Sequence, residues 1–442
     1  MKYGLPSSGP LLAGAMRTAV AAAVLVALAG CASNRTAPPL SYGNPAQQSV
    51  ISNPALLAAG ERINQAQSGE VIAAADMLPD VSLSANATAY VTDDLTPVAR
   101  TDSAELALGI SLPVIRSLAA VRGLKAAQLN TAAEKAAFEA EKADLILEIV
   151  TAIAELDRAR RVAELRSEAF SNLRSFYTDQ RRLLQTGTIS ATDLQQIQAR
   201  IAQAEATLLR ANADRSAAEA KLASLGLSPS QQFQLVDAAS HLPSNEAETL
   251  ALAKASNPKI REAGLRHQSA EQNIAVTAAS LGPDLNVSLN MGTNRTDYLG
   301  GAAVTNQNVN LGFGLNVPLF DGGSRVSQLK QEQSHVRELD YESHALSQSV
   351  DADTRANWYK FQAARGALEL AQRRADIARA ALSGISEARR IGAKSIQEEL
   401  AAMDDVTEAR VAYANTKYDI VTTGHKLLAL TGRISDAYGL NE

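Results

Sequence analysis

Apolar and polar residues alternate along four short segments of this chain. From Val81 to Val91 every odd position is apolar, and the even positions hold serine, asparagine, threonine or tyrosine. A repeat of two residues is typical of a β-strand with two different faces. The same alternation runs through Leu106–Leu112, Leu285–Met291 and Val309–Val317. We therefore predict strands at about 80–91, 104–114, 284–294 and 307–318, each close to the length that a tilted strand needs to cross a bilayer.

The two faces of these strands favour one of two possible environments. Their apolar positions hold no charged residue, and their polar positions hold mainly small uncharged residues. An amphipathic sheet packed on a soluble core would also alternate, but uncharged faces favour a barrel wall with lipid outside and water inside. Four strands are too few to close a barrel, and an open sheet in lipid leaves its edge backbone groups unpaired. If the strands lie in a membrane, several chains must combine.

Long helical segments follow each predicted strand pair. Residues 117–185 contain no proline, and at about 1.5 Å per residue this segment would extend roughly 100 Å. After it, an apolar seam runs from Leu194 to Leu225 in steps of three and four, with Arg215 as the charged exception. Such a seam is typical of coiled-coil packing. The patterns predict long helices at about 117–186, 190–226, 322–390 and 395–431, and a shorter helix before each strand pair.

The chain is a tandem duplication. An Asn-Pro pair at residue 53 recurs at residue 257, and Pro-Asp pairs follow at residues 79 and 283. Glycines at residues 226 and 432 end the last long helix of each half. These landmarks keep a nearly constant offset, which is the mark of an internal repeat. We predict a first repeat over about 46–235, a second over about 236–435 and a C-terminal tail over about 436–442.

The N-terminal region has the pattern of a bacterial lipoprotein signal. A short apolar run ends in Leu-Ala-Gly-Cys, with the cysteine at position 31. The run is too short to span a bilayer, and its end resembles the lipobox, in which the cysteine is acylated. We predict a signal peptide over 1–30, starting at Met1 or Met16, a lipid on Cys31, and a linker over 31–45. A plain signal peptide with an incidental cysteine is the alternative, but Cys31 is the only cysteine of the chain.

Composition and charge narrow the function further. Hydrophobic residues make up 46% of the 442 residues and aromatic residues only 4%. Alanine-rich chains of this kind suit long, closely packed helices. The formal net charge of −5, without a basic run, argues against nucleic acid as a partner. Ala32 follows the cysteine where an aspartate would retain a lipoprotein at the inner membrane, so by resemblance to the enterobacterial sorting rule we expect the outer membrane.

One local motif connects these features to a family. Residues Val317 to Arg325 read Val-Pro-Leu-Phe-Asp-Gly-Gly-Ser-Arg. A proline ends a strand, and paired glycines allow the backbone to turn sharply. Together with the duplicated halves, this motif resembles the junction of the fourth strand and the next helix in the TolC-type outer-membrane efflux family. The resemblance covers roughly residues 46–435 and identifies this junction as Pro318, Asp321, Gly322 and Gly323; the first half lacks the motif.

The resemblance implies an α+β membrane protein. A homotrimer would combine three sets of four strands into a 12-stranded transmembrane β-barrel, continued by a long periplasmic α-helical coiled-coil barrel. The protein would be lipid-anchored in the bacterial outer membrane and extend into the periplasm. It would act as a passive conduit for efflux or type I secretion, with a periplasmic adaptor protein, an inner-membrane transporter and outer-membrane lipid as partners. The transported substrate, whether drug, metal or protein, and the transporter class stay open.

The same resemblance identifies the turns between the long helices as the periplasmic tip. Gly187 and Gly392 match the two tip turns, Asp193 and Glu398 match acidic gate positions, and Lys394 matches a latch arginine. Three copies of Glu398 around one axis would repel one another, bind cations and raise the pKa of the carboxyl groups. The alternative is equally compatible with the residues: Asp193 caps the next helix, and Lys394 and Glu398 form an ordinary surface pair.

Two further positions depart from the family's tip pattern. Arg389 stands at the place of the gate tyrosine, and Ala401 at the place of a second acid. A lysine at position 394 also makes a looser latch than a bidentate arginine.

No catalytic motif is present in the sequence. The five histidines are scattered, and there is no phosphate-binding loop, no nucleophile elbow and no cysteine besides Cys31. We expect no enzyme activity, no metal, and no cofactor apart from the covalent lipid. The alternative to a channel is a lipid-anchored periplasmic coiled-coil stalk or adaptor, which would not need four strands of bilayer length.

Overall fold

The computed structural model describes residues 49–88, 101–114, 116–185, 189–231, 234–298 and 302–440. The predicted signal peptide, Cys31, the linker over 31–45 and Gly187 of the first tip turn lie outside these ranges.

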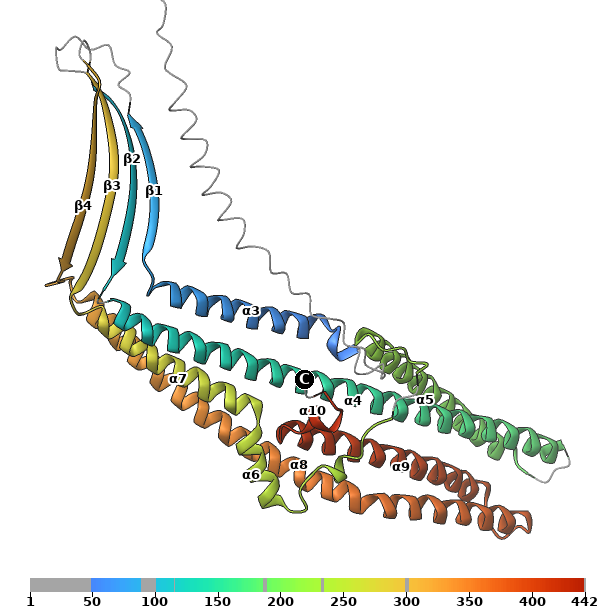
Figure 1. Ribbon diagram of the computed structural model, residues 1–442. Coiled ribbons are helices and arrows are strands. Elements are labelled where there is room, and N and C mark those ends of the chain that lie inside the picture. Colours follow the sequence, from blue (N-terminus) through green and yellow to red (C-terminus); the bar gives the residue numbers. More distant parts are fainter. Residues whose placement is uncertain are drawn as a thin grey trace, which may run out of the picture. The chain divides into compact units, whose positions relative to one another are not determined.

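The two halves have the same order of elements, and this order confirms the predicted fold class (Figure 1). The first half contains α3 (Pro54–Ala75), β1 (Asp80–Thr88), β2 (Thr101–Pro113), α4 (Arg116–Gln185) and α5 (Ala191–Ser224). The second contains α7 (Pro258–Ala279), β3 (Asp284–Tyr298), β4 (Val304–Asn316), α8 (Ser324–Arg390) and α9 (Ile396–Leu430). Between them lie η1 (Ala238–Ser240) and α6 (Glu246–Ser256), and α10 (Ile434–Ala437) follows α9.

The repeated Asn-Pro pairs start equivalent helices. Both α3 and α7 have 22 residues and a proline in the first turn. Asn53 caps α3 by accepting a hydrogen bond from the Ala55 N–H at 2.9 Å. Asn257 caps α7 in the same way, and its Nδ2 also donates to the Leu430 carbonyl at the end of α9. Each cap satisfies a backbone donor that the first turn leaves free.

The four strands form one antiparallel sheet in the order β1-β2-β3-β4, and Figure 1 shows them side by side. The register places apolar residues of all four strands in common rows, for example Val81–Ile110–Leu289–Leu311 and Leu83–Leu108–Met291–Val309. β3 continues to Tyr298, beyond the expected end at 294, whereas β4 ends at Asn316, before Pro318. Proline has no N–H to donate to the ladder, so the strand cannot continue through it.

Helices α4 and α5 pack together, α8 packs on α9, and α4 also contacts α9. The buried residues of α5 are Ile197, Ala211, Ala218 and Leu222, all of which belong to the predicted apolar seam. The exception in that seam, Arg215, is exposed and pairs with Glu219. α4 has 70 residues, which corresponds to about 105 Å of helix.

The main hydrophobic core lies where the middle of α4 meets the ends of α5 and α9. It includes Ile146, Val150 and Leu222, together with Leu428 and Ile434. The chain end contributes as well: Leu440 is 7% exposed and belongs to this core. The segment from residue 436, expected as a tail, is therefore packed as far as residue 440.

Candidate functional site

The first tip turn leads into α5 through a capping box. Ser190 Oγ accepts a hydrogen bond from the Asp193 N–H at 3.1 Å, and the Ser190 N–H donates to Asp193 Oδ2 at 3.2 Å. This reciprocal arrangement satisfies two backbone donors at the helix start. Asp193, a predicted gate residue, thus stabilises α5 within the single chain.

The second tip turn has the same construction at α9. The Glu398 N–H donates to Ser395 Oγ at 3.2 Å, and the Ser395 N–H donates to Glu398 Oε2 at 2.9 Å. Lys394 Nζ donates to the other carboxylate oxygen of Glu398. These hydrogen bonds, first that from Lys394 and then that from the Ser395 backbone, lower the pKa of the Glu398 carboxyl to about 2. In the single chain the local partners therefore act against the rise in pKa expected from three carboxylates around an axis.

The turn before α9 is closed by a glycine. Gly392 has a φ of +81°, which is the left-handed conformation that glycine adopts without a Cβ penalty. Its N–H donates to the Arg389 carbonyl and the Ala393 N–H donates to the Ala388 carbonyl. This pattern is a Schellman motif, which ends α8 and redirects the chain.

The starts of α5 and α9 lie next to each other. Gln397 Nε2 donates to Gln196 Oε1 at 3.1 Å, which joins the first turn of α9 to the second turn of α5. An apolar cluster supports both helix starts and consists of Leu173, Phe176, Ile197, Ile396 and Leu400. Asp193, Lys394 and Glu398 therefore sit at the edge of one packed unit, in which Lys394 contacts Glu398 and Asp193 contacts Ser190.

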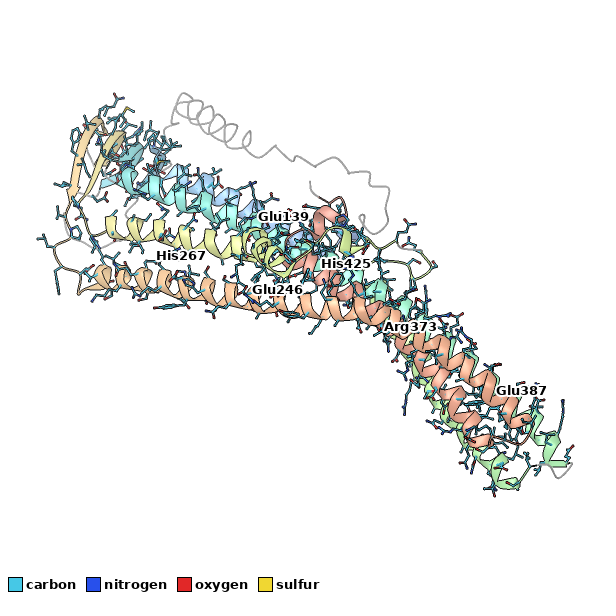
Figure 2. The ribbon with its side chains drawn as sticks, turned by 90° about the horizontal axis from the view of Figure 1, so that it is seen from below. Glu139, Glu246, His267, Arg373, Glu387 and His425 are labelled. Carbon is cyan, nitrogen blue, oxygen red and sulfur yellow. The ribbon has the colours of Figure 1, made fainter. Side chains whose placement is uncertain are left out.

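A buried ion pair that the sequence did not predict lies close to the start of α9. Arg389 of α8 pairs with Glu399 of α9, and their side chains are 18% and 5% exposed. Ser386 Oγ donates to Glu399 Oε1 at 2.6 Å. From α4, Gln180 Oε1 accepts a hydrogen bond from Arg389 at 3.4 Å, and the Phe176 ring lies 5.3 Å from the guanidinium carbon. Three helices thus meet at one charged group, near the end of α8 that Glu387 marks in Figure 2.

A signal for this pair was present in the sequence. Glu399 falls on the same helical face as Ile396, Leu400 and Met403, which all belong to the apolar cluster or pack against it. A carboxylate on an apolar face needs a partner when it is buried. The sequence does not show that this partner is Arg389, because the contact depends on how α8 packs on α9.

Further along α9, two ion pairs nearer the surface link this helix to α4 and α5, which form the first helical hairpin. Arg166 of α4 pairs with Glu408 at 2.8 Å, and Arg200 of α5 pairs with Asp404 at 2.9 Å. Burial is the main cause that raises the pKa of Asp404, and Arg200 opposes it. Surface pairs of this kind contribute little stability individually, whereas the buried pair joins α8 to α9 within the second hairpin.

The strand–helix junction is held by Asp321. Its two carboxylate oxygens accept hydrogen bonds from the backbone N–H groups of Gly323 and Arg325, at 3.0 and 3.1 Å. Gly322 and Gly323 have φ values of +71° and +85°, so both need the freedom of glycine. The Arg325 guanidinium donates to the Ser280 carbonyl just after α7. The junction therefore fixes the start of α8 against the end of α7.

Within the described residues, no group of three or more histidine, cysteine, aspartate or glutamate side chains is arranged to hold a metal ion. No helix within the described ranges is both long enough and apolar enough to cross a membrane.

The chain is similar to known outer membrane efflux proteins. The family profile described as outer membrane efflux protein matches residues 46–226 and 249–433. The outer membrane efflux protein BepC of Brucella suis is 25% identical over 317 residues, which cover 71% of this chain and 69% of BepC. The outer membrane protein TolC of Vibrio cholerae is 25% identical over 202 residues, which cover 45% of this chain and 46% of that protein. The outer membrane channel CmeC of Campylobacter jejuni shares the fold, with a TM-score of 0.79, 18% identity and coverage of 88% and 85% of the two chains.

Proposed function

Because the chain belongs to the outer membrane efflux protein family, we propose that it is the channel subunit of an efflux or type I secretion system. Three copies would form a passive conduit across the outer membrane and through the periplasm. An inner-membrane transporter would supply the energy, and a periplasmic adaptor protein would connect the two. The chain itself would catalyse no reaction and need no cofactor.

The observation that carries this proposal is the exposed apolar face of the sheet. Val309, Leu311, Phe313 and Leu315 of β4 are 70%, 63%, 71% and 65% exposed. The apolar rows run from Leu285 and Leu315 to Leu83 and Val309, a height of about 20 Å at ~3.4 Å per residue. Barrels in outer membranes carry an apolar band about 25 Å tall. Lipid is therefore the environment that suits this face.

The edges of the sheet support the need for further copies. Within the described strands, β1 and β4 each pair with one neighbour, so the other side of each has no partner strand there. In lipid such an edge costs several kcal/mol per group and must be paired. Pairing β4 of one copy with β1 of the next would remove every edge, and three copies would give 12 strands, which is within the range of known barrels.

The N-terminal lipid and the location belong to the same proposal. A lipid on Cys31 would anchor the chain in the outer membrane from the periplasmic side. This anchor alone would also suit a stalk or an adaptor, which is the alternative function. The apolar face of the sheet argues against that alternative, because a stalk in water would expose it at a cost of about 25 cal/mol per Å².

Two neighbouring residues of β4 that lie on opposite faces of the sheet provide a test of the proposed channel. Leu311 belongs to an apolar row and Asn310 to the polar row Ser82–Gly109–Asn290–Asn310. Leu311→Lys should prevent insertion, because a lysine facing lipid near the middle of the bilayer costs about 2–4 kcal/mol per copy. Asn310→Lys would face water and should allow assembly. The measurements are the mass of the purified protein in detergent and ion conductance in planar bilayers.

Each result decides between the two functions. A trimer that conducts, with Leu311→Lys defective and Asn310→Lys conducting, supports the channel. A monomer that never conducts, with both variants equally well behaved, leaves the lipid-anchored stalk.

For the tip we propose that Asp193, Lys394 and Glu398 control entry, with the turns at Gly187 and Gly392 as pivots. Glu398→Gln keeps an oxygen for the Ser395 cap but weakens the contact with Lys394. If Glu398 gates, this change should raise single-channel conductance and lower cation selectivity. Unchanged conductance and selectivity would leave Glu398 as a helix cap only.

A further inference from the structure

The register of the sheet places one acidic residue on the polar face, away from the strand ends at its base. Glu105 pairs with Asn86 of β1 and with Asn294 of β3, and Asn294 pairs with Asn306 of β4. The row Asn86–Glu105–Asn294–Asn306 thus contains one carboxylate among three amides. The strand pattern had predicted mainly small, uncharged residues on this face, and Glu105 is the exception.

The alternation of side chains along β2 places Glu105 on the polar face, because its neighbours in sequence lie on the apolar face. Leu106, Leu108, Ile110 and Leu112 form the apolar stripe of this strand, and odd positions point to the opposite side. On that side the rows next to Glu105 hold Ser84–Ala107–Gly292–Asn308 and Thr88–Ser103–Thr296–Val304. These two adjacent rows hold no charged residue.

All charges on the polar face of the described strands have the same sign. Asp80 and Asp284 stand at the beginnings of β1 and β3, and Glu105 lies further along the sheet. No lysine or arginine of these strands shares their face. Arg295 is on the apolar face, beyond the apolar rows, and pairs there with Asp297 at 3.3 Å. The polar face is therefore purely anionic.

We propose that Glu105 sets the cation preference of the barrel lumen. This inference rests on the proposed channel, in which the polar face lines the water-filled interior and each copy contributes its Glu105 at one height. Glu105 is six residues from Ser111, the partner of Asp80 at the base, or about 20 Å along the strand. The lumen would thus have an acidic ring near its outer end, well separated from the tip and from the acids at the base.

The physical effect of such a ring is an electrostatic barrier to anions. Low-dielectric walls concentrate the field of fixed charges in a narrow passage and enrich counter-ions there. Salt screens this field over about 30 Å at 0.01 M, about 10 Å at 0.1 M and about 3 Å at 1 M. Selectivity that originates at Glu105 should therefore be strong in dilute salt and weak in concentrated salt.

The test measures the reversal potential of purified trimers in planar bilayers with unequal KCl on the two sides. For Glu105→Gln we expect the cation-over-anion permeability ratio to fall by about twofold or more at 0.1 M salt and to change little at 1 M. Glu105→Asp should keep the ratio, and Glu105→Lys should favour anions. Asp297→Asn, which removes an acid from the opposite face three residues beyond the partner of Glu105 in β3, should leave the ratio unchanged.

A second variant protects the test against failures of assembly. Glu105→Cys can be modified after the channel has inserted, with a neutral or a positively charged thiol reagent, because Cys31 is the only other cysteine and an acylated Cys31 offers no thiol. The positively charged reagent should lower cation selectivity more than the neutral one.

The outcomes separate this inference from the proposed function. If the unmodified protein never conducts, the channel itself is refuted. If it conducts with cation preference but Glu105→Gln and modified Glu105→Cys keep the same ratio at low salt, Glu105 does not set selectivity. A loss of preference in Glu398→Gln alone would move the selective step to the tip.

Discussion

Replacing Arg389 by methionine should loosen the tip far more than replacing both members of its ion pair. Methionine fills much of the volume of arginine but carries no charge. In Arg389→Met the Glu399 carboxylate, whose side chain is 5% exposed, loses its ion-pair partner and keeps the Ser386 hydroxyl. The double variant Arg389→Met/Glu399→Met instead places two apolar side chains beside Phe176.

The expected magnitude follows from burial. Removing one partner of a buried ion pair costs about 3–5 kcal/mol, whereas replacing the whole pair with apolar residues is often neutral or stabilising. Because Arg389 is 18% exposed, water reaches part of the pair, and we take the lower end, about 3 kcal/mol. The lost contact with the Phe176 ring adds less than about 1 kcal/mol. A loss of about 3 kcal/mol corresponds to local opening on the order of 100 times more frequent.

Hydrogen exchange followed by mass spectrometry measures this opening locally. Peptides covering the ends of α4 and α8 and the starts of α5 and α9 should exchange on the order of 100-fold faster in Arg389→Met. Peptides from the main core around Val150 and Leu428 should not change. In the double variant the tip peptides should return to within about tenfold of the original rate.

Additive effects would contradict a coupled ion pair. If the effects of Arg389→Met and Glu399→Met sum to that of the double variant, with a coupling below about 0.5 kcal/mol, the pair does not act as a unit. Equal acceleration at the tip and in the main core would show a global loss of stability instead.

Three further predictions concern other parts of the fold. Gly432→Ala should lower the free energy of unfolding by about 2 kcal/mol or more, because φ is +68° and a Cβ would meet the Ser256 carbonyl. The matched control is Gly322→Ala, where φ is +71° and the space is open. This control should lower the free energy of unfolding by about 1 kcal/mol. Asp321→Ala should lower the thermal stability by about 1 kcal/mol through loss of the α8 cap, and Asp321→Asn should retain most of it. Burial lowers the pKa of His425. The neutral His425 therefore stabilises the fold above the pKa of an unfolded histidine, near 6.5, and this stabilisation is lost as the pH falls below that value. Thermal unfolding measured at pH 7 and pH 5 should show a smaller pH effect in His425→Gln than in the unchanged protein.

The features that sequence could predict depend on neighbouring residues. The caps at Asn53 and Asn257 follow from one residue and its next turn, and so do the left-handed glycines at 226 and 432, with φ of +77° and +68°. The strand faces follow from the period of two, and the seam of α5 from its steps of three and four. These local rules were sufficient for the order of elements and for the repeat.

The features that sequence missed depend on contacts between distant segments. Arg389 and Glu399 are close in sequence, but their burial depends on Gln180 and Phe176, more than 200 residues away. Tyr438 Oη donates to His425 Nε2 at 2.9 Å and fixes the chain end to α9, near the place where Figure 2 labels His425. A segment as short as 434–440 has too few residues to show a helical period.

The centre of the sheet joins residues that are far apart in the chain. The ladder between β2 and β3 pairs Leu112 with Val287 and Thr101 with Tyr298, and the intervening chain contains the whole α4–α5 hairpin. Contacts between distant residues form slowly, because a long loop must close before they are gained, whereas helical hairpins form from nearby residues. We therefore expect the helical hairpins to fold first and the sheet to assemble last, once both repeats have been made. Until then the apolar faces of the strands would be exposed to water with their edges unpaired, which makes this stage of folding the one most prone to aggregation.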